Sequence, residues 1–259
     1  MTRTFPLFIL LLLASHAWAE DCPKAIVLYN RATVENDLAV RERCFKKAIA
    51  LCSDPEVLSR VFNNLADTYE RAGRLSPALT YYRNALEAKP DLATSYFSVG
   101  DIFFRLKDYY SAAVMYGKGL SYSPEDEESR KNKKVAETRA RRYMIIYFDF
   151  NSFTIPDRYL KRLDVVGEVI KEYGSDSFLE IMVTGHTCSM GASEYNRQLS
   201  LRRAQAVTRY LNDRLSKPSP VVKVVGKGED APLLSGMDKN ASVLNRRVEV
   251  ILRDKENLQ

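Results

Sequence analysis

Residues 59–92 read SRVFNNLADTYERAGRLSPALTYYRNALEAKPDL, and residues 93–126 read ATSYFSVGDIFFRLKDYYSAAVMYGKGLSYSPED. When the two segments are aligned, small residues fall on small residues and aromatic residues on aromatic residues: Ala66 on Gly100, Tyr69 on Phe103, Ala78 on Ala112, Tyr82 on Tyr116, and Ala85 on Gly119. Pro90 and Pro124 also coincide, and each is expected to end a helix. Because small residues let paired helices approach closely and aromatic rings fill the gaps, this self-similarity predicts a solenoid of helix pairs.

The two units resemble the tetratricopeptide repeat, which has a period of about 34 residues. Gly73-Arg74 and Lys107-Asp108 fall in the turn expected between the two helices of each unit. A degenerate first unit is expected at 25–56, where Ala32 and Ala48 occupy the small positions. A terminal repeat faces solvent on one side, so it does not have to match its neighbours.

In the tetratricopeptide family, the first helices of the units line a concave groove. The resemblance places nine residues of this chain there: Arg60, Asn63, Asp67, Glu70, Arg71, Phe97, Asp101, Phe104 and Arg105. Mixed charge with two exposed phenylalanines suits a peptide segment of a protein partner, here an unknown envelope protein. Because the groove is short, a purely structural spacer is the alternative.

The first residues have the layout of a secretory signal peptide. Arg3 precedes a short apolar run at 6–14, and Ala17-Trp18-Ala19 fits a cleavage site before Glu20. The apolar run is shorter than the ~20 residues needed to cross a bilayer. We therefore expect an exported periplasmic protein without a transmembrane segment in the mature chain.

The charge balance excludes one class of partner. The formal net charge is +6, of which Arg3 contributes one. This mild, dispersed excess is compatible with anionic envelope polymers but does not favour nucleic acid.

Four cysteines occur, at positions 22, 44, 52 and 188. Export permits disulfides. In an antiparallel helix pair at about 23–33 and 38–52, Cys22 and Cys52 lie at the same open end. Cys44 is ~12 Å from Cys52 by helical rise, beyond disulfide reach. The sequence therefore predicts a Cys22–Cys52 disulfide, with Cys44 buried and Cys188 a free thiol.

The segment 125–142 reads EDEESRKNKKVAETRARR, with acids at its start and bases at its end. This order suits a helix macrodipole, and Glu137 with Arg141 is one of three expected pairs four residues apart. We expect a solvated helix that caps the repeats and links them to the next domain. A polybasic patch for a membrane surface is the alternative.

The second half alternates strand-like and helix-like segments. Strands are expected at 144–150, 179–184, 221–225 and 248–252. One helix is expected to begin around Pro156 and to stop at Gly174, and a second is expected to be capped by Ser193. These elements predict an α+β domain, with a mixed β-sheet and helices packed on one face.

Five motifs in this half occur in a recognisable order. They are FDFNS at 148–152, TGHTCSMGASEYN at 184–196, LSLRRAQAV at 199–207, GKGEDAP at 226–232 and NRRVEV at 245–250. Together they resemble the OmpA-like (OmpA/MotB-type) peptidoglycan-binding domain, over nearly all of residues 144–253. The fold class is then multidomain, an all-α tetratricopeptide-repeat solenoid followed by an α+β OmpA-like domain.

The resemblance implies noncovalent recognition of the peptidoglycan stem peptide, chiefly its diaminopimelate residue. The family site supplies one arginine and one acid for the carboxylates and the ammonium of that residue. The arginine corresponds to Arg203, whose planar guanidinium can bind a carboxylate bidentately, assisted by the N-terminus of the nearby helix. A surface salt bridge to Glu194 is the alternative for this arginine.

The acid of the family site corresponds to Cys188, so this sequence departs from the family at half of its charged site. A neutral thiol does not pair with an ammonium as a carboxylate does. Asp149 and Glu229 lie in other motifs and are candidates to compensate.

Other motif residues are expected to shape the site or to contact the peptide. They are Asn151, Thr187, Gly191, Asn196, Leu199, Asn245 and Arg246. For Asn151 and Arg246, structural support and ligand contact are both open.

An enzyme or a metal site at His186 and Cys188 is disfavoured. A nucleophilic cysteine needs an activating and orienting third group, and none is identifiable. One histidine and one cysteine do not complete a tetrahedral zinc site. We therefore expect no enzymatic activity, no cofactor and no metal.

The expected protein is exported, associated with the cell wall or outer membrane, binds peptidoglycan through its C-terminal domain and holds a partner through its repeats. The alternative is an envelope scaffold without wall binding, because the ligand acid is replaced. The expected segments are a signal peptide (1–19), repeats (20–124), a charged linker helix (125–142), the OmpA-like domain (143–253) and a tail (254–259).

Overall fold

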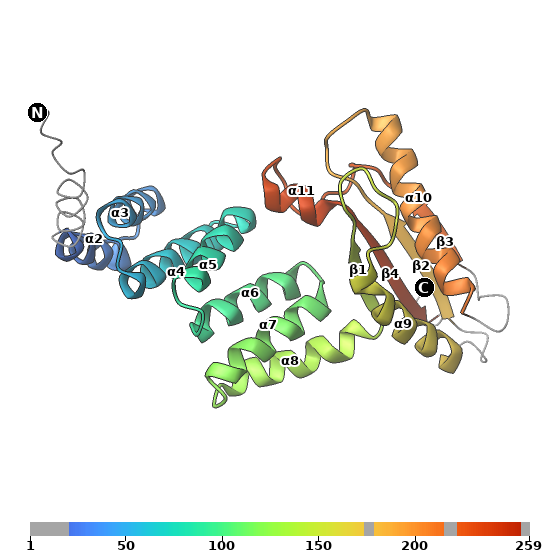
Figure 1. Cartoon of the computed structure of the whole chain (residues 1–259), viewed down its shortest axis with the longest axis horizontal. Coiled ribbons are helices and arrows are strands. Elements are labelled where there is room, and N and C mark those ends of the chain that lie inside the picture. The colour runs from blue at the N-terminus through green and yellow to red at the C-terminus, as the bar shows by residue number, and fades with distance from the viewer. Residues whose placement is uncertain (1–20, 174–178, 215–221, 255–259) are drawn as a thin grey trace, which may run out of the picture. The chain divides into compact units, whose positions relative to one another are not determined.

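The structure, a computed structural model, describes residues 21–173, 179–214 and 222–254 (Figure 1). The expected signal peptide, the helix stop at Gly174 and most of the expected C-terminal tail lie outside the described residues. So does the first residue of the strand expected at 221–225.

The chain divides into two compact units. One contains the residues up to Val99 together with Lys118–Pro124, and the other contains Gly100–Gly117 and the residues from Glu125 onward. The second repeat is thus shared between the units. The segment boundaries expected from the sequence stay predictions.

The repeat region consists of helix pairs joined by short turns. The first pair is α2 (Cys22–Val34) with α3 (Leu38–Leu51). The next pairs are α4 (Pro55–Arg71) with α5 (Leu75–Ala88), and α6 (Ala93–Arg105) with α7 (Tyr109–Tyr122). Gly73 and Lys107 adopt left-handed φ values of 71° and 62° in the turns of the second and third pairs. These turns lie where the 34-residue match places them.

Close helix contacts explain why small residues recur at fixed positions. A Cβ atom on Gly100 would lie 2.8 Å from the Tyr116 ring, and one on Gly119 would lie 2.2 Å from the Phe97 ring. Ala66, Ala78 and the other repeat alanines at these positions are fully buried. The pattern of small and aromatic residues therefore reflects helix packing within each pair.

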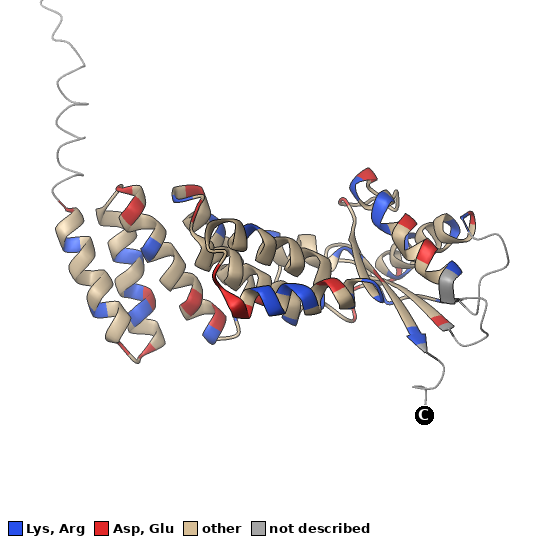
Figure 2. Ribbon diagram, turned by 90° about the horizontal axis from the view of Figure 1, so that it is seen from below, with Lys and Arg blue, Asp and Glu red and all other residues tan. Residues whose placement is uncertain are grey.

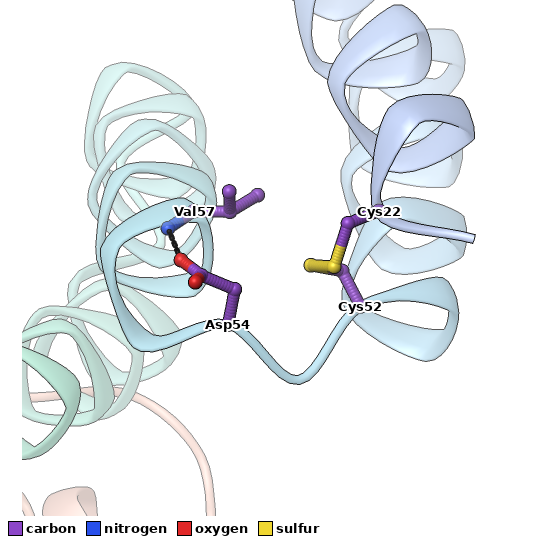
Figure 3. The surroundings of a disulfide bond; sticks show 4 residues. All are labelled: Cys22, Cys52, Asp54 and Val57. Atoms are coloured by element: carbon purple, nitrogen blue, oxygen red, sulfur yellow. Dashed lines mark hydrogen bonds between the residues drawn. A yellow bond between two sulfur atoms is a disulfide. The ribbon is translucent and has the colours of Figure 1, made fainter. Parts of the chain in front are cut away.

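The first helix pair contains the disulfide that the sequence predicts. Cys22 and Cys52 are bonded, with Cα atoms 4.6 Å apart (Figure 3). Cys44 and Cys188 are free and buried. Just beyond the disulfide, Asp54 accepts a hydrogen bond from the backbone N of Val57 at 2.9 Å and caps α4.

Helix α8 (Glu127–Ala140) follows the repeats, with Glu127 and Glu128 in its first turn and mostly basic side chains after them, apart from Glu137 (Figure 2). Asp126 caps it through the backbone N of Ser129. The expected pair of Glu137 with Arg141 is wrong, because the Glu137 carboxylate pairs with Lys133 at 2.7 Å.

The C-terminal domain is an α+β fold. Its elements are β1 (Tyr143–Tyr147), the 3-10 turn η1 (Asp157–Tyr159), α9 (Leu160–Tyr173), β2 (Leu179–Gly185), α10 (Ser193–Asn212), β3 (Val222–Gly226), α11 (Lys239–Asn245) and β4 (Arg247–Asp254). The sheet order is β1-β4-β2-β3. Strand β4 is antiparallel to both β1 and β2, and β3 is parallel to β2, so the sheet is mixed. Helix α10 packs on β2, β3 and β4 and also contacts α9 (Figure 1).

Two expectations about local structure are wrong, and one helix was missed. Strand β1 ends at Tyr147, because the chain then turns into the loop that surrounds Arg203. Ser193 does not cap α10, since the N-cap residue is Ala192 and the Ser193 hydroxyl instead donates to Glu229. Helix α11, capped by Asp238, was not expected because its seven residues carry no clear periodicity.

Candidate functional site

The candidate site lies where β2 ends and the chain leads through a loop into α10. Gly185, the last residue of β2, touches the α10 backbone so closely that a Cβ atom there would lie 1.9 Å from the Ser200 carbonyl oxygen. After it, the His186 backbone N donates to the Arg247 carbonyl, and the Thr187 backbone N donates to the Gly228 carbonyl, both at 2.8 Å. The loop is therefore fixed to β4 on one side and to the segment after β3 on the other.

Arg203 projects from α10 into the centre of this loop cluster and has no exposed surface. Its Nε donates to the Ser152 carbonyl at 2.7 Å. Its two terminal nitrogens donate to the carbonyls of His186 at 3.0 Å and Asp149 at 3.1 Å. Burial, and then the positive charge of Arg246, lower the pKa of Arg203 to about 10, so the guanidinium is charged at neutral pH. The expected alternative of a surface salt bridge to Glu194 is wrong, because that carboxylate accepts from Gln198.

This geometry gives Arg203 a structural role in addition to any role in binding. It ties the loop after β1 to the loop after β2, two segments far apart in the sequence. A guanidinium has five N–H groups, and three are used here. Each terminal nitrogen keeps one N–H without an acceptor among the residues that the structure describes.

Cys188, at the position of the expected acid, is 6% exposed. It lies near enough to Arg203 for a negative charge on its sulfur to raise the pKa of the guanidinium. The structure therefore brings together the two residues that the sequence analysis paired. The thiol supplies no carboxylate at this position.

A carboxylate from another loop lies close by. Glu229 accepts hydrogen bonds from the Ser193 hydroxyl at 2.6 Å and from the Asn196 side-chain amide. These bonds, that of Ser193 first, lower the pKa of Glu229. Glu229 thus occupies the start of α10, where the sequence analysis placed a ligand carboxylate. Since Thr187 bonds to the residue before Glu229, this carboxylate adjoins the Cys188 loop.

Asn151, in the loop after β1, is hydrogen-bonded to Tyr195, in the first turn of α10. Asn151 has a left-handed φ of 54°, and its side-chain oxygen accepts from the Tyr195 hydroxyl. The Tyr195 side chain is 48% exposed. Tyr195 was not among the expected site residues, although its place beside Asn196 in the motif was a signal.

Asn245 and Arg246 mainly support the loops. The Asn245 side chain makes three hydrogen bonds to the backbone of Leu233 and Leu234. Arg246 donates to the Phe148 carbonyl at 3.1 Å and to the carbonyl and hydroxyl of Ser242. Of these two residues, Arg246 is closer to the site, because its guanidinium also lies 5.9 Å from the centre of the exposed Phe150 ring.

Thr187 and Leu199 are both buried. The Thr187 hydroxyl has no hydrogen-bond partner among the described residues. Leu199 lies on the buried face of α10, so a ligand contact by its side chain stays a prediction.

Beneath the loop lies a buried charged cluster that sequence reasoning missed. Glu249 accepts from Arg247 at 2.8 Å and from the Tyr143 hydroxyl at 2.9 Å, and the His186 Nε2 lies 3.6 Å from it. Burial, and then the charge of Arg247, lower the pKa of His186 to about 4, although Glu249 acts in the opposite direction. Burial outweighs the carboxylate, because His186 is only 2% exposed.

The described residues contain no group of three or more histidine, cysteine, aspartate or glutamate side chains placed to hold a metal ion. His186 and Cys188 flank Thr187 but have different surroundings. The histidine Nε2 lies 3.6 Å from the Glu249 carboxylate, whereas the cysteine lies near Arg203.

The two phenylalanines expected in the repeat groove are not exposed. Phe97 is half-buried against Gly119, and Phe104 packs edge-on against Tyr109, with the Arg139 guanidinium 5.1 Å from its centre. The expectation of two exposed rings is wrong, because α7 and α8 supply partners for both.

The polar groove residues also have partners within the chain. Asn63 accepts from Ser95, Glu70 from Tyr82 and Asp101 from Tyr116. Arg60 pairs with Glu56, and Asp67 with Arg71. Arg105 is exposed. Binding of a partner by these residues stays a prediction.

Comparison with known proteins gives the family of each half. The OmpA family profile matches residues 147–246, and the tetratricopeptide repeat profile matches residues 59–92 and 93–126. The peptidoglycan-associated lipoprotein of Pasteurella multocida is 30% identical over 137 residues, which are 53% of this chain and 89% of that protein. The chain belongs to the OmpA family.

Other OmpA-family relatives are matched over the same half. The peptidoglycan-associated lipoprotein of Pseudomonas aeruginosa is 34% identical over 44% of this chain, and the match spans 65% of that protein. The crystal structure of the Burkholderia pseudomallei peptidoglycan-associated lipoprotein is 30% identical, with 44% of this chain and 92% of that chain covered and a TM-score of 0.40. No helix in the described part of this chain is long and apolar enough to cross a membrane.

Proposed function

We propose that this OmpA-family protein is exported to the cell envelope and binds peptidoglycan noncovalently through the loops around Arg203. It acts as a binding protein, not as an enzyme. The observation that carries the proposal is a buried, charged arginine held by the carbonyls of Asp149, Ser152 and His186. A buried charge is costly, and the domain that holds it is similar to relatives named peptidoglycan-associated lipoproteins.

In this proposal, the ligand is the stem peptide and its diaminopimelate residue. A carboxylate of the ligand enters between the 149–152 and 186–188 segments and accepts from the two remaining N–H groups of Arg203. The loops must part slightly for this, because Arg203 has no exposed surface. Asn151 and Tyr195 form the exposed wall of the entrance, with Thr187, Asn196, Leu199 and Arg246 behind it.

The protein offers no carboxylate at position 188 to pair with the ligand ammonium. Glu229 is the nearest replacement on the α10 side, since a carboxylate that accepts two hydrogen bonds retains further acceptor sites. On the other side, the Asp149 carboxylate is exposed and has no ion-pair partner among the described residues. We propose that one of these two acids serves the ammonium, at lower affinity than a carboxylate at position 188 gives.

The competing function is an envelope scaffold that does not bind the cell wall and that acts through its repeats. The observation that favours it is the replacement of the acid by Cys188. In either case we propose that the repeat region holds a protein partner.

Co-sedimentation of the mature chain with purified peptidoglycan sacculi separates the two functions. We expect the wild type to sediment and Tyr195→Ala to weaken binding, because Tyr195 lines the entrance and its side chain is 48% exposed. Tyr122→Ala is the matched control, since Tyr122 in α7 is 50% exposed and far from the site in sequence. If the wild type stays in the supernatant, the proposal of wall binding is wrong and the scaffold is the remaining candidate.

A further inference from the structure

We propose that the surface around Arg141 is a docking site for a short acidic peptide segment, with one carboxylate between two apolar side chains. The surface belongs to the second compact unit and is separate from the peptidoglycan site. It consists of two hollows with volumes of about 390 and 570 Å³, and Arg141 lines both.

The first hollow is walled by α7, α8, α9 and β1. Its walls are mainly apolar, and three of its large side chains are unusually exposed, namely Tyr110 at 43%, Val114 at 37% and Val165 at 56%. Ala140 and Met144 also line it. Apolar side chains that are exposed together and surrounded by charged residues are typical of an interaction site.

The second hollow lies on the other side of Arg141. The apolar side chains of Val169, Ile251 and Leu252 line it together with the rings of Tyr109 and Tyr143. These two rings pack edge-on, with centroids 5.8 Å apart. An apolar side chain of a partner fits here, as another fits in the first hollow.

Basic side chains lie around both hollows, which favours an acidic ligand. The first hollow carries Lys133, Arg141 and Arg162 against a single acid, Glu137. Glu137 is already paired with Lys133, and Arg162 is stacked on Tyr110 with its guanidinium carbon 3.6 Å from the ring centre. The Arg141 guanidinium is exposed and has no hydrogen-bond or ion-pair partner among the described residues. It is therefore the cation available to a carboxylate.

The shape favours a peptide over a membrane surface. A layer of anionic headgroups attracts an open basic face, but here Arg139 is turned onto the rings of Phe104 and Tyr109 and Lys133 is neutralised. Two separate apolar hollows that share one unpaired arginine match a chain with alternating apolar and acidic side chains. Such anchors in pockets are a recurrent mode of peptide recognition.

The test is selection of a displayed library of random short peptides on the full mature chain. Selected peptides are then titrated by fluorescence anisotropy against the wild type and four variants. Arg141→Glu reverses the shared charge, and Val165→Glu places an acid in the apolar wall. The matched controls are Lys131→Glu, exposed on α8 outside both hollows, and Val27→Glu, 67% exposed on α2. All four positions are exposed, so thermal unfolding should remain close to that of the wild type.

We expect the selection to enrich peptides with an acid between two apolar residues. Their affinity should fall at least tenfold with Arg141→Glu and with Val165→Glu, and less than twofold with either control, since one charge-assisted hydrogen bond corresponds to about ten- to a hundredfold. Replacing the peptide acid by its amide should have a similar effect to Arg141→Glu.

Three results would overturn the proposal. The first is no enrichment, or enrichment of basic peptides. The second is equal loss of affinity in the controls. The third is binding of phosphatidylglycerol vesicles that depends on Arg141 while no peptide is enriched, which would assign the surface to lipid. Binding to peptidoglycan sacculi should be unchanged in Arg141→Glu. Failure of the peptide-docking proposal is therefore distinguishable from failure of the peptidoglycan proposal.

Discussion

The repeat helices and the loops around Arg203 use charged side chains in opposite ways. On α4, Arg60 pairs with Glu56 at 3.0 Å, and its side chain is 64% exposed. On α10, Arg203 has no exposed surface and bonds only to backbone carbonyls. The exposed Arg60–Glu56 ion pair contributes little to stability, because water solvates both groups when the pair breaks. The buried hydrogen bonds of Arg203 contribute more, because no water is present to replace a lost partner.

The two regions therefore differ in how much their charged side chains contribute to stability. In the repeats, stability rests mainly on the packing of small residues against aromatic rings, and most charged side chains lie at the surface, with the buried Asp108 as an exception. In the loops, one cation holds together backbone segments that no strand or helix joins. We therefore expect mutations of charged residues to have large effects at the loops and small effects on the repeats.

The largest effect is expected from Arg203→Ala. Removing the guanidinium leaves the carbonyls of Ser152 and His186 without a donor, takes one of two donors from the Asp149 carbonyl and opens a cavity. The free energy of unfolding should therefore fall by about 3–5 kcal/mol. Arg60→Ala, as the matched control, should change it by less than about 1 kcal/mol. Urea denaturation of both variants measures the difference, and equal effects would remove the contrast between the two regions.

The next largest effect concerns the disulfide, the one covalent constraint in the repeats. Replacing both Cys22 and Cys52 by alanine releases a loop whose ends are 30 residues apart. In the chain-entropy treatment, this costs about 3–4 kcal/mol of stability in the first helix pair. Cys44→Ala, a buried free cysteine, serves as the control. Non-reducing peptide mapping that gives another pairing would contradict the assignment.

A smaller effect, in binding and not in folding, is expected from Cys188→Asp. A carboxylate beside Arg203 can pair with the ligand ammonium, and a charge-assisted hydrogen bond contributes ~1.5–3 kcal/mol. Calorimetric titration with a synthetic diaminopimelate-containing stem peptide should show affinity raised by roughly ten- to a hundredfold. Unchanged affinity would mean that another acid already serves the ammonium, and Glu229→Gln and Asp149→Asn then identify it.

The smallest effect is a pH dependence that arises from His186. Its pKa is about 4 in the folded protein, below the ordinary value of 6.5, so the unfolded chain takes up the proton first as the pH falls. The stabilisation is complete above pH 6.5 and is lost progressively towards pH 4. Between pH 7.5 and pH 5, the free energy of unfolding should fall by about 2 kcal/mol.

Arg247, Glu249 and Lys227 are the charged groups that act on this histidine. His186→Gln should flatten the dependence over the same range, because the glutamine side chain takes up no proton. Urea denaturation at the two pH values is the measurement, and an equally steep dependence in the variant would assign it to other groups.

The sequence predicts the repeats well because their contacts are periodic. Gly100 and Gly119 fall where an aromatic ring crosses the helix pair, and the matching positions of the first repeat hold Ala66 and Ala85, which are also small. The disulfide follows from the same regularity, since the length of two antiparallel helices determines which cysteines meet.

The loops are only partly predictable, because their contacts have no period. The motifs place Arg203 and Cys188 together, yet nothing in them indicates that three carbonyls enclose the guanidinium. The carboxylate of Glu229 reaches the start of α10 through a loop contact 33 residues away in sequence. The exposure of Phe97 and Phe104 was predicted wrongly for a related reason, because side-chain partners on the following helices depend on rotamers and not on spacing.

Hydrogen exchange of the mature chain, with and without a diaminopimelate-containing stem peptide, tests the central claim most directly. It reports on both regions in one experiment, because amides that the ligand covers or stabilises exchange more slowly. We predict slower exchange in segments 149–152 and 187–196, with no change in residues 21–92. Protection confined to the repeats, or no protection anywhere in the chain, would contradict the assignment of wall binding to the loops around Arg203.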